Sequence, residues 1–407
     1  MTALPASFRL TGNRLSLDPH EDAFVQDPYA AYAALQHQAP VFFWEEYGLW
    51  CVTGHEQVNA LLRDRRLGRE NRWGPPLLAG EGRAHVAAFD AVERHSLLER
   101  EPPVHTRLRA LVNKAFVSRQ VERLRPRIAA LSTELAEALR PGDDLLGAFA
   151  TPIPVTVIAD MLGVPVSMNG QLLDWSHRMV RMYMHGRTHA DEESANAAAA
   201  EFSGFLRELI SGRRAHEGDD LLSVLIAARD HGEKLTEDEL VTSVILLLNA
   251  GHEATVHQTG NAIRTILAQG GDPRRFFATP DLTEATVEEC LRIDAPLHLF
   301  TRFAYEAVDL GPATLQPGEQ VGLMLGAANR DPSAFEAPHD FRPGRPDQRN
   351  VTFGAGIHFC IGAPLARLEM QVSLKALFDR HPGLTLAEEP RYRDAYHFHG
   401  LERILMA

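Results

Sequence analysis

Apolar positions along the chain recur mostly with the spacing of an α-helix, and the longest such run crosses its middle. This helical pattern begins at Thr236 and persists to Gln269, where Gly270-Gly271 ends it. The stretch Thr236-Glu237-Asp238-Glu239 has the form of a capping box, in which a hydroxyl and a carboxylate satisfy free backbone N–H groups. At a rise of about 1.5 Å per residue, the helix would be roughly 50 Å long, enough to cross a whole domain.

Shorter helical runs and a few strand-like runs make up the remainder of the pattern. Helices are predicted near residues 29–36, 56–63, 120–140, 157–162, 169–185, 193–213, 283–294 and 364–380, with another that opens at Pro102-Pro103. Strands are predicted near residues 41–44, 49–53, 299–304, 307–309 and 320–325, the first two as a hairpin. Pro152 and Pro154 predict a short extended stretch, and residues 68–101 are irregular except for a weak helix near 85–98. The fold class predicted is mainly α with small β-sheets.

Composition and charge narrow the class of protein. The chain has 407 residues, of which 45% are hydrophobic and 23% charged, as in an ordinary globular protein with ample core. The net charge of −13 argues against a general nucleic-acid binder. Three widely spaced cysteines indicate a reducing compartment, and no segment has the length and apolarity of a membrane anchor or a signal sequence. We therefore expect a soluble cytoplasmic protein.

One cysteine lies in an unusual glycine-rich stretch, Phe353-Gly354-Ala355-Gly356-Ile357-His358-Phe359-Cys360-Ile361-Gly362. Its glycines allow positive φ and let the backbone approach a bulky group. Pro364 and the residues after it predict a helix directly behind the cysteine. A thiol beside a helix N-terminus is favoured as thiolate, and a soft anionic ligand suits haem iron. Cys51 and Cys290 lack these surroundings and are expected to be small buried apolar residues.

This stretch resembles the haem-ligand loop of the cytochrome P450 family. It matches at Phe353, Gly354, Gly356, His358, Cys360 and Gly362. It lacks the third glycine and the βαβ unit of a dinucleotide fingerprint. The resemblance extends over essentially the whole chain, with five motifs in the family's order. It implies a single domain over residues 1–407 with the P450 fold. It also implies haem b (iron protoporphyrin IX) between a long distal helix and a proximal loop, with Cys360 as the metal ligand.

A second motif is the pair Glu289 and Arg292, which are three residues apart and so share one face of a helix. Taken alone, such a pair is usually a surface ion pair worth less than about 1 kcal/mol. Its distance before the cysteine loop resembles that of the family's E-x-x-R pair. The resemblance implies a structural role, in which Arg345 joins the pair and the charge network braces the proximal side of the haem.

Four basic residues resemble the family's clamps for the haem propionates. His105 and Arg109 lie in Pro102-Pro103-Val104-His105-Thr106-Arg107-Leu108-Arg109, and Arg302 and His358 lie further along the chain. Buried propionates must be neutralised, and Arg or protonated His donors do this. The alternative for each is a solvated surface charge.

The long helix contains Ala250-Gly251-His252-Glu253-Ala254-Thr255, in which a carboxylate and a hydroxyl interrupt an apolar pattern. A zinc site that pairs His252 with His257 fails, because helical zinc motifs need histidines four residues apart and a fifth residue turns the side chain off that face. The stretch instead resembles the family's oxygen-activation motif. That implies room for dioxygen beside Ala250 and proton relay by Glu253.

The same motif departs from the family at one position. Ala254 occupies the place of the usual Thr, and Thr255 follows one residue later, about 100° further round the helix. Thr255 has an ordinary alternative as a hydrogen-bond donor to the carbonyl of Gly251. Whether Thr255, a water or the substrate replaces the missing alcohol stays open at this point.

The resemblance implies a haem-thiolate monooxygenase that inserts one oxygen atom of O2 into a small hydrophobic substrate. Since no electron-transfer domain is fused, electrons would come from a separate ferredoxin with an NAD(P)H-dependent reductase, and the enzyme would be a monomer. Alternatives are a peroxide-driven peroxygenase and a non-catalytic haem-binding sensor. By the same resemblance, substrate contacts would come from the 70–100 and 175–195 segments and from individual residues, namely Leu246, Asn249, Ala250, His298 and Phe398.

Overall fold

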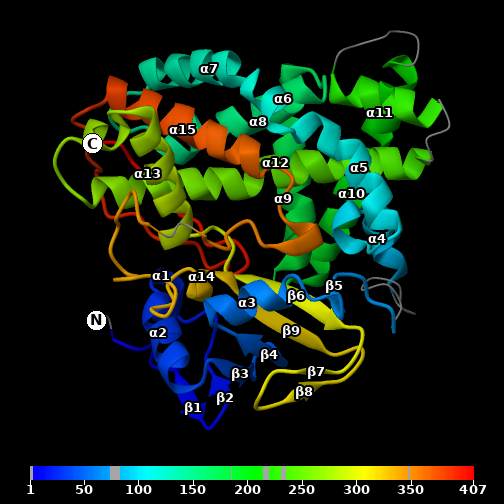
Figure 1. Ribbon diagram of the computed structural model, residues 1–407. Helices are drawn as coiled ribbons and strands as arrows, with labels where there is room; N and C mark the ends of the chain where they lie inside the picture. The colour runs from blue at the N-terminus through cyan, green and yellow to red at the C-terminus, as the bar shows by residue number, and fades with distance from the viewer. Residues whose placement is uncertain (1–2, 74–82, 185, 214–219, 231–234, 347–348) are drawn as a thin grey trace. The chain divides into compact units, whose positions relative to one another are not determined.

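The computed structural model describes residues 3–73, 83–184, 186–213, 220–230, 235–346 and 349–407 (Figure 1). The chain divides into two compact units. The first unit comprises Met1–Gly68, Ala129–Ala150 and Ala254–Ala407, and the second comprises Arg69–Ile128 and Thr151–Glu253. The chain therefore passes from one unit to the other four times. Residues 74–82, within the segment predicted to be irregular, lie outside the described part of the chain.

The first unit contains a mixed sheet of seven short strands. In spatial order these are β1, β2, β3, β4, β9, β6 and β5. Their bounds are Arg9–Thr11, Arg14–Ser16, Val41–Trp44, Leu49–Val52, Gln320–Met324, Leu299–Ala304 and Leu67–Gly68. β2 pairs with β3 and β4 with β9 in parallel, while the other neighbours are antiparallel. A separate ribbon pairs β7 (Val308–Asp309) with β8 (Thr314–Leu315).

Alternating side chains of the sheet supply two hydrophobic cores. Phe42 and Cys51 belong to one core, which includes residues of α1 (Asp22–Gln26) and α2 (Tyr29–Gln38). Val41 and Val52 belong to the other, which includes residues of α3 (His55–Leu61) and α14 (Leu325–Ala328). Because successive strand residues point to opposite faces, both faces of these strands are covered.

The other helices of the first unit position its functional loops. They are the greater part of α7 (Arg125–Ala138), η3 (Leu146–Ala150), η6 (Pro273–Phe277), α13 (Pro280–Ile293), η7 (Gly356–His358) and α15 (Ala363–Arg380). Helix α13 packs against α15 (Figure 1). Along the chain, β6 follows α13, and η7 precedes Cys360 and α15.

The second unit is helical in the residues that the structure describes. Its elements are η1 (Ala84–Val86), α4 (Ala87–Arg94), η2 (Leu97–Glu99), α5 (Val104–Phe116), α6 (Ser118–Glu122), α8 (Pro152–Met161), η4 (Val166–Met168), α9 (Asn169–Val180), η5 (Arg181–Tyr183), α10 (His189–Arg213) and α11 (Leu221–Asp230). The antiparallel neighbours α9 and α10 pack along each other, with Trp175 stacked on Phe202 at a centroid distance of 4.8 Å.

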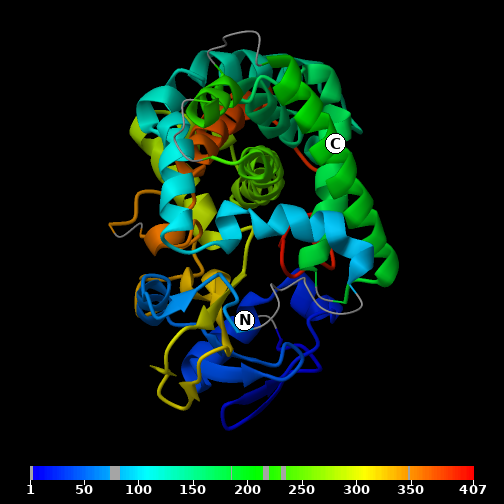
Figure 2. The same ribbon diagram turned by 90° about the vertical axis from the view of Figure 1, so that its right-hand side faces the viewer.

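Helix α12 (Glu237–Leu267) belongs to the second unit up to Glu253 and to the first unit from Ala254. It is α-helical over its whole length, and Figure 2 shows it almost end on. The predicted capping box is confirmed. The Glu239 N–H donates to Thr236 Oγ1 at 3.2 Å, and the Thr236 N–H donates to Glu239 Oε2 at 2.9 Å. The sequence therefore determines the start of this helix to one residue.

Two sequence predictions are wrong at prolines. The stretch after Thr151 is the start of α8, with Pro152 in its first turn, where a missing N–H costs nothing. The predicted helix over residues 120–140 is two helices, α6 and α7, and Pro126 stands at the second position of α7. In both places proline begins a helix, where we had expected an extended segment or an uninterrupted helix.

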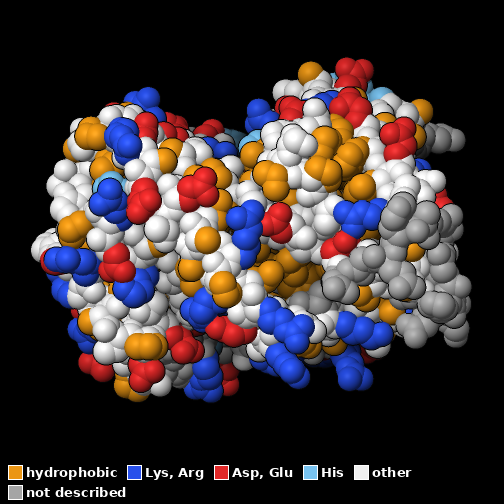
Figure 3. All heavy atoms as spheres, turned by 90° about the horizontal axis from the view of Figure 1, so that it is seen from above, with side chains coloured by type: hydrophobic (Ala, Val, Ile, Leu, Met, Phe, Trp, Pro, Cys, Tyr) orange, Lys and Arg blue, Asp and Glu red, His pale blue; other side chains and the backbone are white. Residues whose placement is uncertain are grey.

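Charged side chains of both signs are scattered over one face of the molecule. Lys and Arg side chains lie among Asp and Glu side chains over the face shown in Figure 3. The net charge of −13 is therefore not gathered into one acidic field on this face. Among the described helices, none combines the length and the apolar composition needed to cross a membrane.

Candidate active site

The glycine-rich loop of the first unit forms a tight turn that ends at Cys360. Gly354 and Gly356 have φ values of 68° and 71°, a conformation that favours glycine. A Cβ on Gly356 would lie 2.5 Å from the Leu62 carbonyl oxygen, so that position also needs glycine for space. The expectation of a positive φ is wrong for the third glycine, Gly362, because its φ is −80° and it serves as the N-cap of α15. The Cys360 N–H donates to the Phe353 carbonyl at 3.0 Å, which closes the turn.

The three cysteines have very different surroundings. Cys51 and Cys290 are buried, as predicted, and burial raises the pKa of both thiols. Cys360 is exposed and lies just before the N-cap of α15, where backbone N–H groups of the first helical turn favour a negative charge. Cys360 is therefore the cysteine whose environment suits a thiolate ligand.

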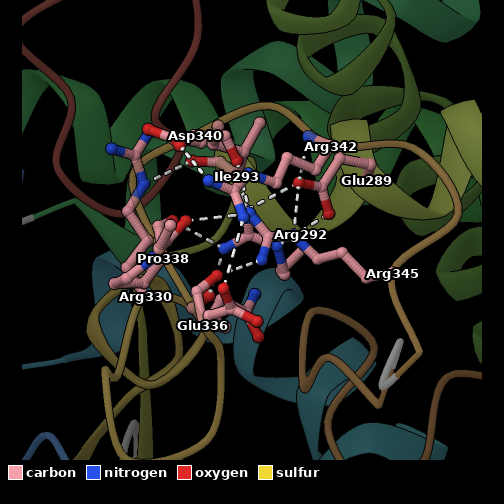
Figure 4. Close-up of polar contacts among 11 residues, drawn as sticks. Glu289, Arg292, Ile293, Arg330, Glu336, Pro338, Asp340, Arg342 and Arg345 are labelled. Atoms are coloured by element: carbon pink, nitrogen blue, oxygen red, sulfur yellow. Dashed lines mark hydrogen bonds and ion pairs between the residues drawn. The ribbon is translucent and has the colours of Figure 1, made fainter.

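Glu289 and Arg292 of α13 form the centre of a buried charge network in the first unit (Figure 4). Arg292 Nε and Nη2 each donate to one carboxylate oxygen of Glu289 at 2.8 Å, and Arg345 Nε donates to the same carboxylate at 2.8 Å. Glu289 and Arg292 are 3% and 2% exposed, so the surface ion pair considered as an alternative is excluded. Burial also lowers the pKa of Arg292, against the opposite effect of Glu289.

The remaining donors of the two arginines hold a loop in place. Arg292 donates to the backbone carbonyls of Asn329, Pro338 and Asp340, and Arg345 donates to those of Glu336, Ala337 and Asp340 (Figure 4). The network therefore ties α13 to the segment that leads into the cysteine loop.

Two of the predicted propionate-binding residues lie in the first unit. Arg302, on β6, is buried, and its Nη1 donates to the Thr301 carbonyl at 2.9 Å. His358, in η7, is half-buried two residues before the cysteine. Burial of a guanidinium needs an anion or strong acceptors nearby, so Arg302 is not the solvated surface charge considered as an alternative.

The other two lie on α5 in the second unit. His105 is buried and Arg109 half-buried, four residues apart on the same helix face. Arg107, between them, points elsewhere and donates from Nη1 to Glu239 of α12 at 3.0 Å. Helix α5 thus uses one basic residue to secure the start of α12 and presents the other two along one face.

Within α12, the predicted oxygen-activation stretch combines small and buried residues. Ala250 is exposed, and Leu246 and Ala254, four residues to either side, are half-buried, so these three positions form a row on one face. A Cβ on Gly251 would lie 2.9 Å from the Ile158 side chain, so a larger residue there would displace α8. Asn249 is half-buried and donates to the sulfur of Met179 at 3.6 Å.

Glu253 is buried, but it faces histidines of two helices within the second unit. Its Oε2 lies 3.3 Å from Nε2 of His177 on α9 and 3.8 Å from Nε2 of its neighbour His252. The His177 side chain is 57% exposed, whereas those of His252 and Glu253 are 2% and 8% exposed. The sequence gives no signal for His177, which lies far from Glu253 along the chain. The carboxylate is therefore linked to the protein surface through an imidazole.

Two predicted substrate contacts in the first unit are found in the core. The His298 ring is completely buried, and its Nδ1 lies 2.8 Å from the Tyr32 hydroxyl. This burial leaves no surface of the ring for a substrate, so His298 is a structural residue of the cluster around Asp294. Phe398 is 9% exposed and packs near the ring of His257.

Comparisons with known proteins agree with this arrangement. The family model for cytochrome P450 matches residues 278–383, which include the charge network and the cysteine loop. Cytochrome P450 107B1 of Saccharopolyspora erythraea is 38% identical over 97% of this chain and 98% of its own length. The chain therefore belongs to the cytochrome P450 family.

Further relatives show the activity and the fold. The 6-deoxyerythronolide B hydroxylase of the same organism is 35% identical over 95% of this chain and 97% of its own length. P450BioI, solved with an acyl carrier protein that carries hexadec-9Z-enoic acid, superposes with a TM-score of 0.87. It is 33% identical, and the match covers 94% of this chain and 99% of that one. This chain has the P450 fold and is a P450 monooxygenase, an oxidoreductase that incorporates oxygen.

The cofactor of this family is haem b, and the residues on hand fit it. An exposed thiol at the head of α15 would supply an anionic sulfur ligand, and the exposed apolar side chains of Ile357 and Phe359 precede it in sequence. Within the first unit, Arg302 and His358 would supply donors to the propionates of the haem. An anionic ligand and such donors are what an iron porphyrin with two carboxylates requires.

Proposed function

We propose that this enzyme hydroxylates a small hydrophobic organic substrate with one oxygen atom of O2. A separate ferredoxin and an NAD(P)H-dependent reductase supply the electrons in this proposal. We further propose that residues 1–407 make up one haem domain, active as a monomer, and the cytoplasmic location stays a prediction. The activities for which the relatives are named support the reaction class, since they include a 6-deoxyerythronolide B hydroxylase and a vitamin D3 25-hydroxylase.

The observation that carries this proposal is the contrast between Cys360 and the two other cysteines. Only Cys360 is exposed, and it alone lies beside the free N–H groups of a long helix. A thiolate there would be the protein ligand of the iron, and the haem when bound would supply the oxygen-inserting chemistry.

The protein's own residues have three kinds of task in this proposal. Arg302, His358, His105 and Arg109 neutralise the propionates. Glu289 with Arg292 and Arg345 keeps the segment before the cysteine loop rigid. Ala250 leaves space on α12, and Glu253 holds and passes on a proton, which it receives from the protein surface. Leu246, Asn249 and Phe398 remain proposed substrate contacts.

The ligand assignment is tested by the absorption of the reduced, carbon monoxide-bound protein. Wild type and Cys51→Ala should show the red-shifted Soret band of thiolate ligation, and Cys360→Ala should not. If Cys360→Ala keeps the band, another residue is the ligand. A screen of terpenoids, polyketides, fatty acids and small aromatics for a low- to high-spin shift would then identify the substrate class.

The reaction class is tested by turnover on a substrate found in that screen. With a surrogate ferredoxin, its reductase and NADH, we expect hydroxylated product that contains one atom from labelled O2. Product with peroxide alone and none with the electron-transfer partners would favour a peroxygenase. Ligand-induced spectral shifts without product in either assay would favour a sensor.

A further inference from the structure

Three potential metal ligands meet within the second unit, on α9 and α12. Nitrogen atoms of His177 and His252 and a carboxylate oxygen of Glu253 all lie within 4.8 Å of one another. The sequence argument against zinc concerned His252 with His257, and it still holds. The new element is His177, which the fold brings to His252 and Glu253 from another helix.

The orientation of His252 is already that of a metal ligand. Its Nδ1 lies 2.8 Å from the Leu248 carbonyl oxygen, so Nδ1 carries a hydrogen, and in the neutral ring Nε2 carries the lone pair. Histidines that bind metals usually donate their second N–H to a backbone carbonyl or carboxylate, which fixes the ring. The lone pair of Nε2 is on the side of Glu253, whose Oε2 is 3.8 Å away.

Two of the three ligand-to-ligand distances are close to those around a small tetrahedral ion, and the third, between the two imidazole nitrogens, is within 4.8 Å. Two atoms bound to zinc at about 2.0–2.1 Å are about 3.3–3.4 Å apart when the geometry is tetrahedral. His177 Nε2 and Glu253 Oε2 are 3.3 Å apart, and the His252 contact of 3.8 Å would have to shorten by a few tenths of an ångström. The exposed His177 gives the ion a path from solvent to the two buried ligands.

Two other groups of metal-binding side chains are less suitable. In the cluster of Asp294, His298 and His399, both carboxylate oxygens already accept hydrogen bonds from Tyr29 and Tyr392, and all three residues are buried. In the cluster of His85, His189 and Glu192, Arg187 Nε already donates a hydrogen bond to Glu192 Oε1 at 3.0 Å.

We propose that His177, His252 and Glu253 bind a divalent transition-metal ion, and specifically Zn²⁺. Two imidazoles and one carboxylate are a common zinc ligand set, with the fourth position left for water. We also expect bound zinc to inhibit the enzyme, and this expectation rests on the proposed function of Glu253. A carboxylate that is bound to zinc cannot pass on protons, so zinc would stop turnover while it is bound.

The binding test uses the haem-loaded protein and Zn²⁺ as the probe. After equilibrium dialysis over the micromolar range, elemental analysis should find one zinc equivalent that His177→Ala binds about tenfold more weakly or worse. His37→Ala, which removes an exposed helical histidine of the first unit, should bind like wild type. Binding should weaken from pH 8 to pH 6, because protons compete for the imidazoles. The site is refuted if wild type takes up no zinc or if His177→Ala binds it as wild type does.

The functional test compares product formation with and without zinc in the same three proteins. Zinc should inhibit wild type and His37→Ala at the concentrations at which it binds, and should inhibit His177→Ala only at about tenfold higher concentration. If zinc binds through His177 and turnover continues, the metal site stands and the role of Glu253 in proton delivery is refuted. If zinc inhibits all three proteins equally, the inhibition arises at another site, and the inference that zinc inhibits through Glu253 is wrong.

Discussion

Glu289 and Glu253 are two buried carboxylates whose partners differ in one chemical property. Glu289 accepts hydrogen bonds from two arginines and from the backbone N–H of Arg342. Guanidinium groups keep their charge at any pH at which the protein is folded. The negative charge of Glu289 is therefore permanently compensated, and the donors leave the carboxylate little freedom to move.

Glu253 faces imidazoles in place of guanidiniums. Imidazole gains and loses a proton near neutral pH, and His177 is more than half exposed. In the proposed function, one buried glutamate is therefore fixed and the other passes on protons. Both carboxylates are buried, so the type of partner, guanidinium or imidazole, would separate the structural carboxylate from the one that transfers protons.

The largest expected effect is that of removing the fixed carboxylate. Glu289→Ala leaves Arg292 and Arg345 buried without their anion, which should cost about 3–5 kcal/mol of stability. We expect little soluble, haem-loaded protein, measured by yield and by the ratio of Soret to protein absorbance. Glu284→Ala, at an exposed position of the same helix, is the control and should yield normal protein. A stable and fully loaded Glu289→Ala protein would remove the distinction between the two carboxylates.

The next effect concerns the exchanging carboxylate. Glu253→Gln keeps the size and removes the transferable proton, so product formation should fall about a hundredfold or more, while folding and haem content remain normal. The exposed carboxylate Asp238 at the start of α12 offers a control, because Asp238→Asn should leave the rate unchanged. If Glu253→Gln were instead to lose haem and unfold like Glu289→Ala, Glu253 would be a structural carboxylate too.

These two carboxylates also show how far the sequence determines the site. The partners of Glu289 were predictable, because Arg292 is three residues away on one helix and Arg345 belongs to a recognisable motif. The local chemistry of the cysteine loop was predictable for the same reason, as were both positive-φ glycines. In each case the signal lies in a short stretch of sequence that resembles a motif of the family.

What the sequence does not determine are contacts between distant helices. His177 belongs to an amphipathic helix with several polar positions, and only the packing of α9 beside α12 brings it to Glu253. His298 was misjudged for the same reason, since its neighbours Tyr29 and Tyr32 come from the start of the chain. The predictions for α8 and α7 are wrong because proline can begin a helix as well as end one.

A third buried carboxylate, Glu369 of α15, extends the comparison to one without a cation. It is 2% exposed, and its Oε1 has no hydrogen-bond partner among the described residues. Burial raises the pKa of Glu369 to about 8, so the folded protein keeps it protonated at neutral pH. Between the unfolded pKa of 4.5 and about 8, the unfolded state ionises first, and stability falls as the pH rises.

Glu369→Gln should remove this dependence. The expected gain is at most about 1.4 kcal/mol for each pH unit above 4.5, hence at most about 3–4 kcal/mol near pH 7, and nothing at pH 4. Thermal midpoints of the two proteins should therefore separate as the pH increases from 5 to 8. Asp379→Asn, an exposed change on the same helix, should show no such divergence. Parallel curves for wild type and Glu369→Gln would mean that Glu369 is ionised in the folded protein.

The smallest expected effect is that of substitutions at Ala254 and Thr255, the two residues directly after Glu253. Most family members have Thr or Ser where this chain has Ala254. Helix α12 is α-helical throughout this stretch, so no local distortion turns Thr255 into that place, and its side chain lies about 100° away. We therefore infer that a water or a polar group of the substrate completes the relay. Substrates without such a group should waste reducing equivalents.

The measurement is the fraction of NADH consumption that ends in hydroxylated product. Ala254→Thr supplies the missing hydroxyl and should raise this fraction within a few-fold, mainly for substrates that lack a polar group near the reacting carbon. Thr255→Ala should have a mild effect, similar to that of Thr259→Ala one turn further along the helix, because both hydroxyls are buried on α12. A collapse of the fraction in Thr255→Ala alone would make Thr255 the catalytic alcohol. Proton delivery would then depend on a hydroxyl of the protein and not on a water or the substrate. The contrast with Glu289 would then concern Glu253 alone and not the residues that follow it.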